Sequence, residues 1–105
     1  MRSVLLTGAD RGVGFALCQQ FVENGWKVYA GQFMPDWAEL SNLQDTYREQ
    51  VEIIPLNVAD TESVKNAARY VAERTEVLDM LVNCAGIGGR EDDRAAMKAV
   101  FHVNT

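Results

Sequence analysis

Four short apolar runs alternate with segments of helical periodicity along this chain of 105 residues. The runs lie at residues 3–7, 27–31, 51–58 and 78–82, and their nearly continuous apolar character is typical of strands covered on both faces. The helical segments begin near residues 12, 35, 60 and 92, and the last one runs to residue 105. Alternation of strands and helices with short connections predicts an α/β fold, in which helices cover both faces of a parallel sheet.

The third apolar run contains a proline that helps to predict the strand order. Proline has no N–H group to donate to a neighbouring strand, so Pro55 fits best on an edge strand. In a doubly wound sheet of order 3-2-1-4, the third strand lies at the edge. We therefore predict a Rossmann-like sheet of that order, with right-handed crossovers.

The helices carry apolar residues at helical spacing and recognisable ends. Residues 12–24 form the first predicted helix, and Gly25 follows it at a position where glycine often ends a helix. Pro35 or Asp36 opens the second, which carries its apolar residues at Trp37, Leu40, and Leu43 or Tyr47. Asp60 or Thr61 caps the third, whose apolar stripe comprises Val64, Ala67, Ala68, Val71 and Ala72.

Composition narrows the range of functions. Ten Lys and Arg residues against fifteen Asp and Glu residues give a net charge of −5, which argues against binding of nucleic acid or of an acidic membrane surface. No apolar run is long enough to span a bilayer, and the first eight residues do not resemble a signal peptide. Cys18 and Cys84 lie far apart, which indicates neither a disulfide framework nor a metal site. We expect a cytoplasmic protein.

A glycine-rich loop joins the first strand to the first helix. Its sequence is Thr-Gly-Ala-Asp-Arg-Gly-Val-Gly at residues 7–14. Gly8 permits a tight turn, Gly12 allows close approach of a pyrophosphate, and Gly14 allows the helix to pack against the sheet. The free N–H groups at the start of the helix then face the phosphates. An ordinary glycine-rich turn is the alternative interpretation of this motif alone.

With Thr7 in front, the GxxxGxG spacing resembles the short-chain dehydrogenase/reductase family. Three further motifs strengthen the resemblance. Residues 81–86 are similar to the family's NNAG motif, with Cys84 in place of the second Asn, and residues 57–60 are similar to its Asp-Val pair, with Asn57 in place of Asp. Residues 103–105 match the segment that carries the family's catalytic asparagine. The motifs occur in the family's order, and the resemblance covers the whole chain.

The resemblance implies a role for each matching position. Asn104 corresponds to the catalytic asparagine, which helps to hold the water chain that refills the proton donor. Asn57 and Val58 would contact the adenine, while Asn83, Ala85 and Gly86 would line the cofactor beyond the fourth strand. The residues implied in cofactor binding are Gly8, Arg11, Gly12, Val13, Gly14, Asn57, Val58, Asn83, Ala85 and Gly86.

The cofactor implied is NAD(P), and the residues give limited guidance on which form is preferred. About twenty residues beyond the glycines, NAD sites place an acid and NADP sites an arginine. Here that position falls on Gln32 and Phe33, neither of which is charged. Arg11 can reach a 2′-phosphate, so we favour NADP(H), with a solvated loop cation as the alternative interpretation of Arg11.

The family transfers hydride between nicotinamide and a carbonyl or alcohol carbon, with a Ser, a Tyr and a Lys four residues after the Tyr as its acid–base machinery. This sequence has tyrosines at 29, 47 and 70 only, and Tyr70 is followed by Arg74 rather than by Lys. We therefore expect residues 1–105 to be the dinucleotide-binding part of one domain, cut short after the fourth strand and its helix. Alone, we expect it to be inactive and marginally stable, with an exposed fourth-strand edge prone to self-association. A non-catalytic nucleotide-binding module and an inactive fragment are the alternatives.

Overall fold

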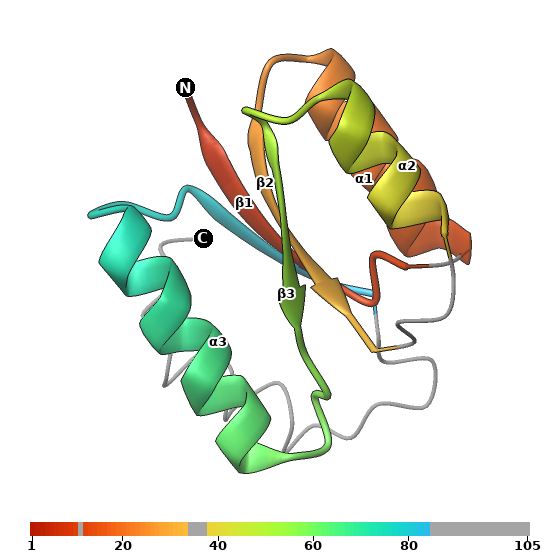
Figure 1. Cartoon of the computed structure of the whole chain (residues 1–105). Helices are drawn as coiled ribbons and strands as arrows, with labels where there is room; N and C mark the ends of the chain where they lie inside the picture. The colour runs from red at the N-terminus through yellow and green to blue at the C-terminus, as the bar shows by residue number, and fades with distance from the viewer. Residues whose placement is uncertain (11, 34–37, 85–105) are drawn as a thin grey trace.

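Four parallel strands form one sheet in the order β3-β2-β1-β4 (Figure 1). The structure is a computed structural model that describes residues 1–10, 12–33 and 38–84. The strands are β1 (Ser3–Thr7), β2 (Lys27–Gln32), β3 (Val51–Pro55) and β4 (Met80–Asn83). The predicted doubly wound, Rossmann-like architecture and its strand order are thus confirmed. The helix expected after the fourth strand lies outside the described residues.

Within the described residues, three helices cover the two faces of the sheet (Figure 1). Helices α1 (Gly12–Glu23) and α2 (Glu39–Thr46) lie on one face, and α3 (Thr61–Arg74) lies on the other. Each face has its own core. On the α1 and α2 face, the buried side chains include Val4, Leu6, Cys18, Val28, Ala30, Leu40 and Val51. On the α3 face they are Leu5, Tyr29, Ile54, Leu56, Val64, Ala67 and Val71.

Alternation along the strands explains this division. Leu5 of β1 faces α3, while Val4 and Leu6 on either side of it face α1 and α2. Successive side chains of a strand point to opposite faces, so a sheet covered on both faces needs apolar residues at every position. All five residues of β1 are buried, in agreement with its position inside the sheet.

Pro55 ends the edge strand β3, as its chemistry requires. The main-chain N–H of Leu56 donates to the carbonyl of Gln32 on β2. Neighbouring residues of a strand direct their main-chain groups to opposite sides, so the nitrogen of Pro55 faces the open edge. There the missing N–H costs no hydrogen bond within the sheet.

Three strands differ from their expected bounds. The second strand was expected over 27–31 and reaches Gln32. The third strand was expected to reach residue 58 but ends at Pro55, because the chain turns at Asn57, whose carbonyl accepts from the Asp60 N–H at 3.0 Å. The fourth strand was expected over 78–82 but spans Met80–Asn83. Before it, the Asp79 carboxylate and main-chain N–H bind Ser3, at 2.8 Å and 3.0 Å.

The end of α1 and the start of α3 agree with the sequence prediction, whereas the start of α2 differs from it. Gly25 follows α1 with a φ of +84°, and Asp60 caps α3 by accepting from the Glu62 N–H at 3.1 Å. Helix α2 begins at Glu39, whereas a start at Pro35 or Asp36 was expected. Residues 34–37 lie outside the described residues, so Trp37 has no described position.

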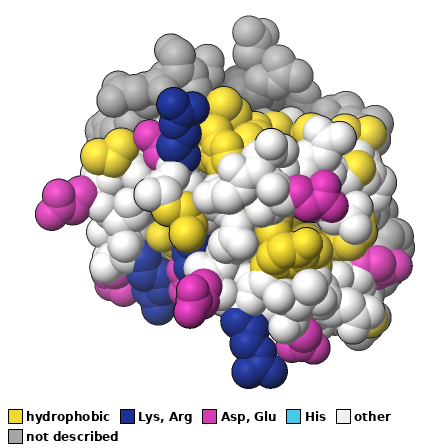
Figure 2. Space-filling model, turned by 90° about the horizontal axis from the view of Figure 1, so that it is seen from above, with side chains coloured by type: hydrophobic (Ala, Val, Ile, Leu, Met, Phe, Trp, Pro, Cys, Tyr) yellow, Lys and Arg dark blue, Asp and Glu magenta, His cyan; other side chains and the backbone are white. Residues whose placement is uncertain are grey.

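The face at the amino ends of the strands carries charges of both signs. Figure 2 shows Lys and Arg interspersed with Asp and Glu on this face, and separate groups of hydrophobic atoms between them. Among the described helices, none has the length and apolar character needed to cross a membrane.

Candidate functional site

The glycine loop brings the start of α1 into direct contact with the end of β1. Gly8 and Gly12 have φ values of +61° and +55°, which L side chains rarely adopt. A Cβ added to Gly14 would lie 2.8 Å from the carbonyl carbon of Gly8, and closer still to its oxygen. Glycine is therefore required at position 14 by contact, and at positions 8 and 12 by conformation. Val13, in the first turn of α1, has 70% of its surface exposed.

Thr7 joins the carboxyl ends of β1 and β4. Its hydroxyl donates to Asn83 Oδ1 at 2.8 Å and accepts from the Cys84 N–H at 2.9 Å. Thr7 is fully buried, and it lies directly opposite Asn83 in the parallel register. The start of the glycine loop and the described part of the second motif, through Cys84, are thus held side by side. Sequence reasoning noted Thr7 in the motif but did not assign it this function.

Asp10 ties the glycine loop to the end of β2. Its carboxylate accepts from the main-chain N–H of Phe33 at 3.1 Å, and the N–H of the neighbouring Ala9 donates to the Gly31 carbonyl at 2.9 Å. Asp10 is only 2% exposed. Sequence reasoning missed it, although Asp inside a glycine-rich turn is a residue type that binds main-chain N–H groups.

Asn57 and Val58 follow β3, at the same carboxyl end of the sheet as the glycine loop. Asn57 Oδ1 accepts from the Ala59 N–H at 3.1 Å, and its main-chain N–H donates to Ser63 Oγ at 2.9 Å. The side chain therefore shapes the turn into α3. A carbonyl oxygen has two lone pairs, so the prediction that Asn57 also accepts a hydrogen bond from adenine stays open.

The remaining predicted site residues lie outside the described part of the chain. They are Arg11, Ala85, Gly86 and Asn104. Cys84 and Cys18 are free thiols, and burial raises the pKa of Cys84 and raises that of Cys18 to about 12. Both are therefore protonated thiols near neutral pH, as expected for small packed residues.

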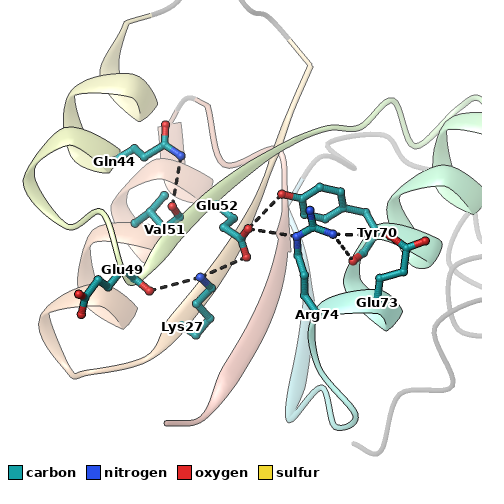
Figure 3. A network of polar contacts seen from close by, with 8 residues as sticks. All are labelled: Lys27, Gln44, Glu49, Val51, Glu52, Tyr70, Glu73 and Arg74. Atoms are coloured by element: carbon teal, nitrogen blue, oxygen red, sulfur yellow. Dashed lines mark hydrogen bonds and ion pairs between the residues drawn. The ribbon is translucent and has the colours of Figure 1, made fainter.

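Tyr70 is engaged in a surface network rather than placed beside the glycine loop (Figure 3). Its hydroxyl donates to Glu52 Oε1 at 3.0 Å, and the Arg74 guanidinium lies 3.5 Å from the centre of its ring. Burial, and then the hydrogen bond to Glu52, raise the pKa of Tyr70 above its ordinary value of 10.0. The Tyr-x-x-x-Arg segment thus contributes both of its named side chains to a polar network that joins α3 to β3.

Glu52 is the centre of this network. It also binds Lys27 Nζ at 3.1 Å and Arg74 Nε at 3.2 Å, and so connects β2, β3 and α3. Burial raises the pKa of Glu52, but the hydrogen bonds from Lys27 and Tyr70 and the charges of Lys27 and Arg74 lower it further than burial raises it. The net result is a pKa below the ordinary 4.5.

This lowered pKa predicts a loss of stability in acid. The stabilising effect of ionised Glu52 is complete above pH 4.5 and is lost as the pH falls through the lower pKa of the folded state. We expect the urea-measured free energy of unfolding of Glu52→Gln to fall less steeply below pH 4.5 than that of the parent. At pH 7 the substitution should cost about 1 kcal/mol, since its ion pairs are partly exposed.

Glu49→Gln is the matched control for this prediction. Glu49 is exposed on the turn before β3, and its side chain has no ion pair within the described residues. Identical pH profiles for the parent and Glu52→Gln would contradict the role given to Glu52.

The strand order reverses at β1: β2 and β3 lie on one side of it and β4 on the other. After β1 the chain crosses to α1 on one face, and after β3 it reaches β4 through α3 on the other face (Figure 1). In doubly wound folds, ligands bind outside the carboxyl ends of the strands, at the point where the strand order reverses. The glycine loop, Thr7 and Asn83 all lie at this point.

Comparison with known proteins agrees with this geometry. The family model described as short chain dehydrogenase matches residues 2–105. The chain belongs to the short-chain dehydrogenase family. Among curated members of the family, it is 33% identical over 108 residues to the short-chain dehydrogenase anuI of Penicillium roqueforti and 35% identical over 107 residues to (+)-neomenthol dehydrogenase of Arabidopsis thaliana.

These short-chain dehydrogenases are longer than the present chain. The alignments cover 96% and 93% of this chain, but 43% and 35% of the two relatives. The solved structure of an NADPH-bound carbonyl reductase from chicken fatty liver superposes with a TM-score of 0.81 and 28% identity, over 97% of this chain and 50% of that chain. The chain thus spans half or less of the length of these three proteins.

Proposed function

We propose that this chain is the cofactor-binding part of an NAD(P)-dependent oxidoreductase, which transfers hydride between nicotinamide and a carbonyl or alcohol carbon. The observation that carries the proposal is the close approach of Gly14 to Gly8, beyond the carboxyl end of β1, which pairs with β4. With no side chain between them, the start of α1 can present its N–H groups to a pyrophosphate at short range. Family membership supports the same function.

The residues at the carboxyl ends of the strands fit a dinucleotide. Gly8, Gly12, Val13 and Gly14 would hold the pyrophosphate, and Asn57 and Val58 at the end of β3 would bind the adenine. Asn83, oriented by Thr7, would line the nicotinamide side. When bound, the cofactor supplies the hydride, and the chain contributes its orientation. From the sequence motifs, Arg11, Ala85 and Gly86 would complete the binding set, and Asn104 would hold water for the proton donor.

The proposal includes a preference for NADPH over NADH, which rests on Arg11. An arginine that binds a 2′-phosphate makes a charge-assisted hydrogen bond, worth about tenfold in affinity. We expect Arg11→Ala to weaken NADPH binding by about this factor and to leave NADH binding within about twofold, as measured by isothermal titration calorimetry. The carbonyl reductase from chicken fatty liver, solved with NADPH, supports this form of the cofactor.

Arg48→Ala serves as a control, since Arg48 is exposed on the turn before β3, near the amino ends of the strands. Tighter binding of NADH than of NADPH, or equal NADPH affinities of Arg11→Ala and the parent, would contradict the preference.

One alternative proposal is a nucleotide-binding module without catalysis. It is favoured by the engagement of Tyr70 with Glu52 and by the absence of Lys four residues after any tyrosine in this sequence. NADPH oxidation in the presence of a carbonyl compound separates the two proposals. We expect residues 1–105 alone to bind NADPH and not to reduce the carbonyl compound. Reduction of the carbonyl compound would contradict the expectation that these residues do not include the proton donor.

A further inference from the structure

A pocket lies between the edge strand β3 and helix α3, where β3 leads into the helix. Its volume of 340 Å³ falls within the roughly 300–1,000 Å³ typical of sites for small molecules. The lining is mainly apolar and includes Ile54, Pro55, Ala67 and Tyr70. Its described residues are all different from those that the proposed function assigns to the cofactor. A separate ligand is therefore needed to explain this pocket.

The open edge of β3 offers few partners to a further strand beside this pocket. The main-chain N–H of Val51 donates to the carbonyl of Tyr47 at 3.1 Å, and the carbonyl of Val51 accepts from the Gln44 side chain at 3.3 Å. At the other end of the strand, Pro55 has no N–H to donate. The pocket thus suits a small molecule, which needs no row of main-chain hydrogen bonds, better than an added strand.

The walls of the pocket are held in place without a ligand. The Tyr70 hydroxyl donates to Glu52 Oε1 at 3.0 Å, and the Arg74 guanidinium lies 3.5 Å from the centre of the Tyr70 ring (Figure 3). Ile54 and Ala67 are 2% and 1% exposed and belong to the core between the sheet and α3. Side chains that are already fixed lose little conformational freedom when a ligand binds.

The mouth of the pocket at the start of α3 is negatively charged. Asp60 and Glu62 both line the pocket, and its described lining includes no lysine or arginine. Neither carboxylate has an ion pair within the described residues. The start of a helix carries a partial charge of about +0.5, so two carboxylates leave this mouth negative overall. At the other end of the pocket, the charge of Arg74 is paired with Glu52.

We infer that the pocket between β3 and α3 binds a small organic cation. The apolar body of the ligand would pack against Pro55 and Tyr70, and its ammonium or guanidinium group would lie beside Asp60 and Glu62. Charge complementarity selects the cation, because an anion of the same shape is repelled by both carboxylates and a neutral molecule gains only the apolar contact. This site goes beyond the proposed function and does not depend on it.

Titration of the 105-residue chain with phenethylamine, followed by the amide chemical shifts in NMR spectra, tests the inference. We expect saturable shifts at Ser63, Asn66 and Ala67, which line the pocket, with a Kd of about 1 mM. Phenethyl alcohol has the same ring without the charge and should bind about fivefold more weakly. Hydrocinnamate, which carries a carboxylate, should bind more weakly still. Ethylamine keeps the charge but lacks the ring, and it should lose at least about tenfold.

Two charge-neutralising variants locate the cation within the pocket. Glu62→Gln should weaken phenethylamine binding by about threefold and leave the binding of phenethyl alcohol unchanged. Glu23→Gln is the matched control, since Glu23 is exposed at the end of α1 on the opposite face of the sheet (Figure 1). It makes the same change in net charge and should leave the binding of both compounds unchanged. Urea unfolding of the two variants checks that they fold like the parent.

The ligand series tests the inference on the parent chain alone, without any variant. The inference is overturned if phenethylamine gives no saturable shifts about tenfold above the expected Kd, or if phenethyl alcohol binds as tightly. Equal phenethylamine affinities of Glu62→Gln and Glu23→Gln would also overturn it. The parent is titrated with NADPH in parallel. A lack of NADPH binding would contradict the proposed function and leave this inference standing.

Discussion

Alanine at position 14 is expected to destabilise the protein more than alanine at position 12 or 25. The added Cβ of Gly14→Ala would lie 2.8 Å from the Gly8 carbonyl carbon. Because the atoms that it would meet belong to the main chain of Gly8 and Ala9, no rotation of a side chain can relieve the overlap. Overpacking of this kind costs about 3 kcal/mol. That is a large part of the 5–15 kcal/mol typical of a whole domain. Urea unfolding followed by circular dichroism measures the loss.

Two other glycines provide controls for this substitution. Gly25 and Gly12 both have positive φ values, but a Cβ at either position meets no atom within 4 Å. Gly25→Ala and Gly12→Ala should therefore cost about 1 kcal/mol each, from backbone conformation alone. If Gly14→Ala loses no more than Gly25→Ala, then α1 does not pack against Gly8 as described. The proposed pyrophosphate site would lose its main support.

Removal of the Thr7 hydroxyl is expected to have the second largest effect. Thr7→Val keeps the shape of the side chain but leaves Asn83 Oδ1 and the Cys84 N–H without the hydroxyl they share. Loss of two hydrogen bonds at a fully buried position should cost about 2–3 kcal/mol. The loss is measured by urea unfolding. NADPH affinity should fall as well, because Asn83 is no longer oriented.

Thr7→Ser distinguishes the hydroxyl from the methyl group. Serine keeps both hydrogen bonds and removes one buried methyl, which should cost about 1 kcal/mol. The argument for Thr7 as the connection between β1 and β4 fails if Thr7→Ser is as unstable as Thr7→Val. It also fails if Thr7→Val binds NADPH with unchanged affinity.

Local chemistry was sufficient to predict most of the fold. Strand–helix alternation and right-handed crossovers leave few possible strand orders, and Pro55 helped to choose among them. Its nitrogen indeed faces the open edge of β3. The bounds of β1 and the capping of α3 by Asp60 also followed from residue type. In each case the deciding property belongs to the residue itself and does not depend on distant parts of the chain.

Contacts between distant segments set the limits of sequence reasoning. The third strand ends before residue 58 because Asn57 forms a turn with Ala59 and Asp60. The sequence gives no sign of this turn, since the apolar run continues through Val58. At positions 32 and 33 the lack of charge was correctly noted. The bond between Asp10 and Phe33 joins residues 23 positions apart, so it becomes visible only when β1 and β2 are paired. Arg11 and Asn104 lie outside the described residues, and their roles stay predictions.

The two edge strands, β3 and β4, are not equivalent, so further strands should pair with one edge of the sheet rather than with the other. On the β3 side, a new strand would meet a nitrogen that cannot donate, at Pro55. On the other side, the described part of β4 carries the half-buried sequence Met-Leu-Val-Asn and no charged side chain. Strands contributed by a longer polypeptide, or by a second copy, should therefore add beyond β4, and the proposed nucleotide site would then lie in the interior of the enlarged sheet rather than at its margin.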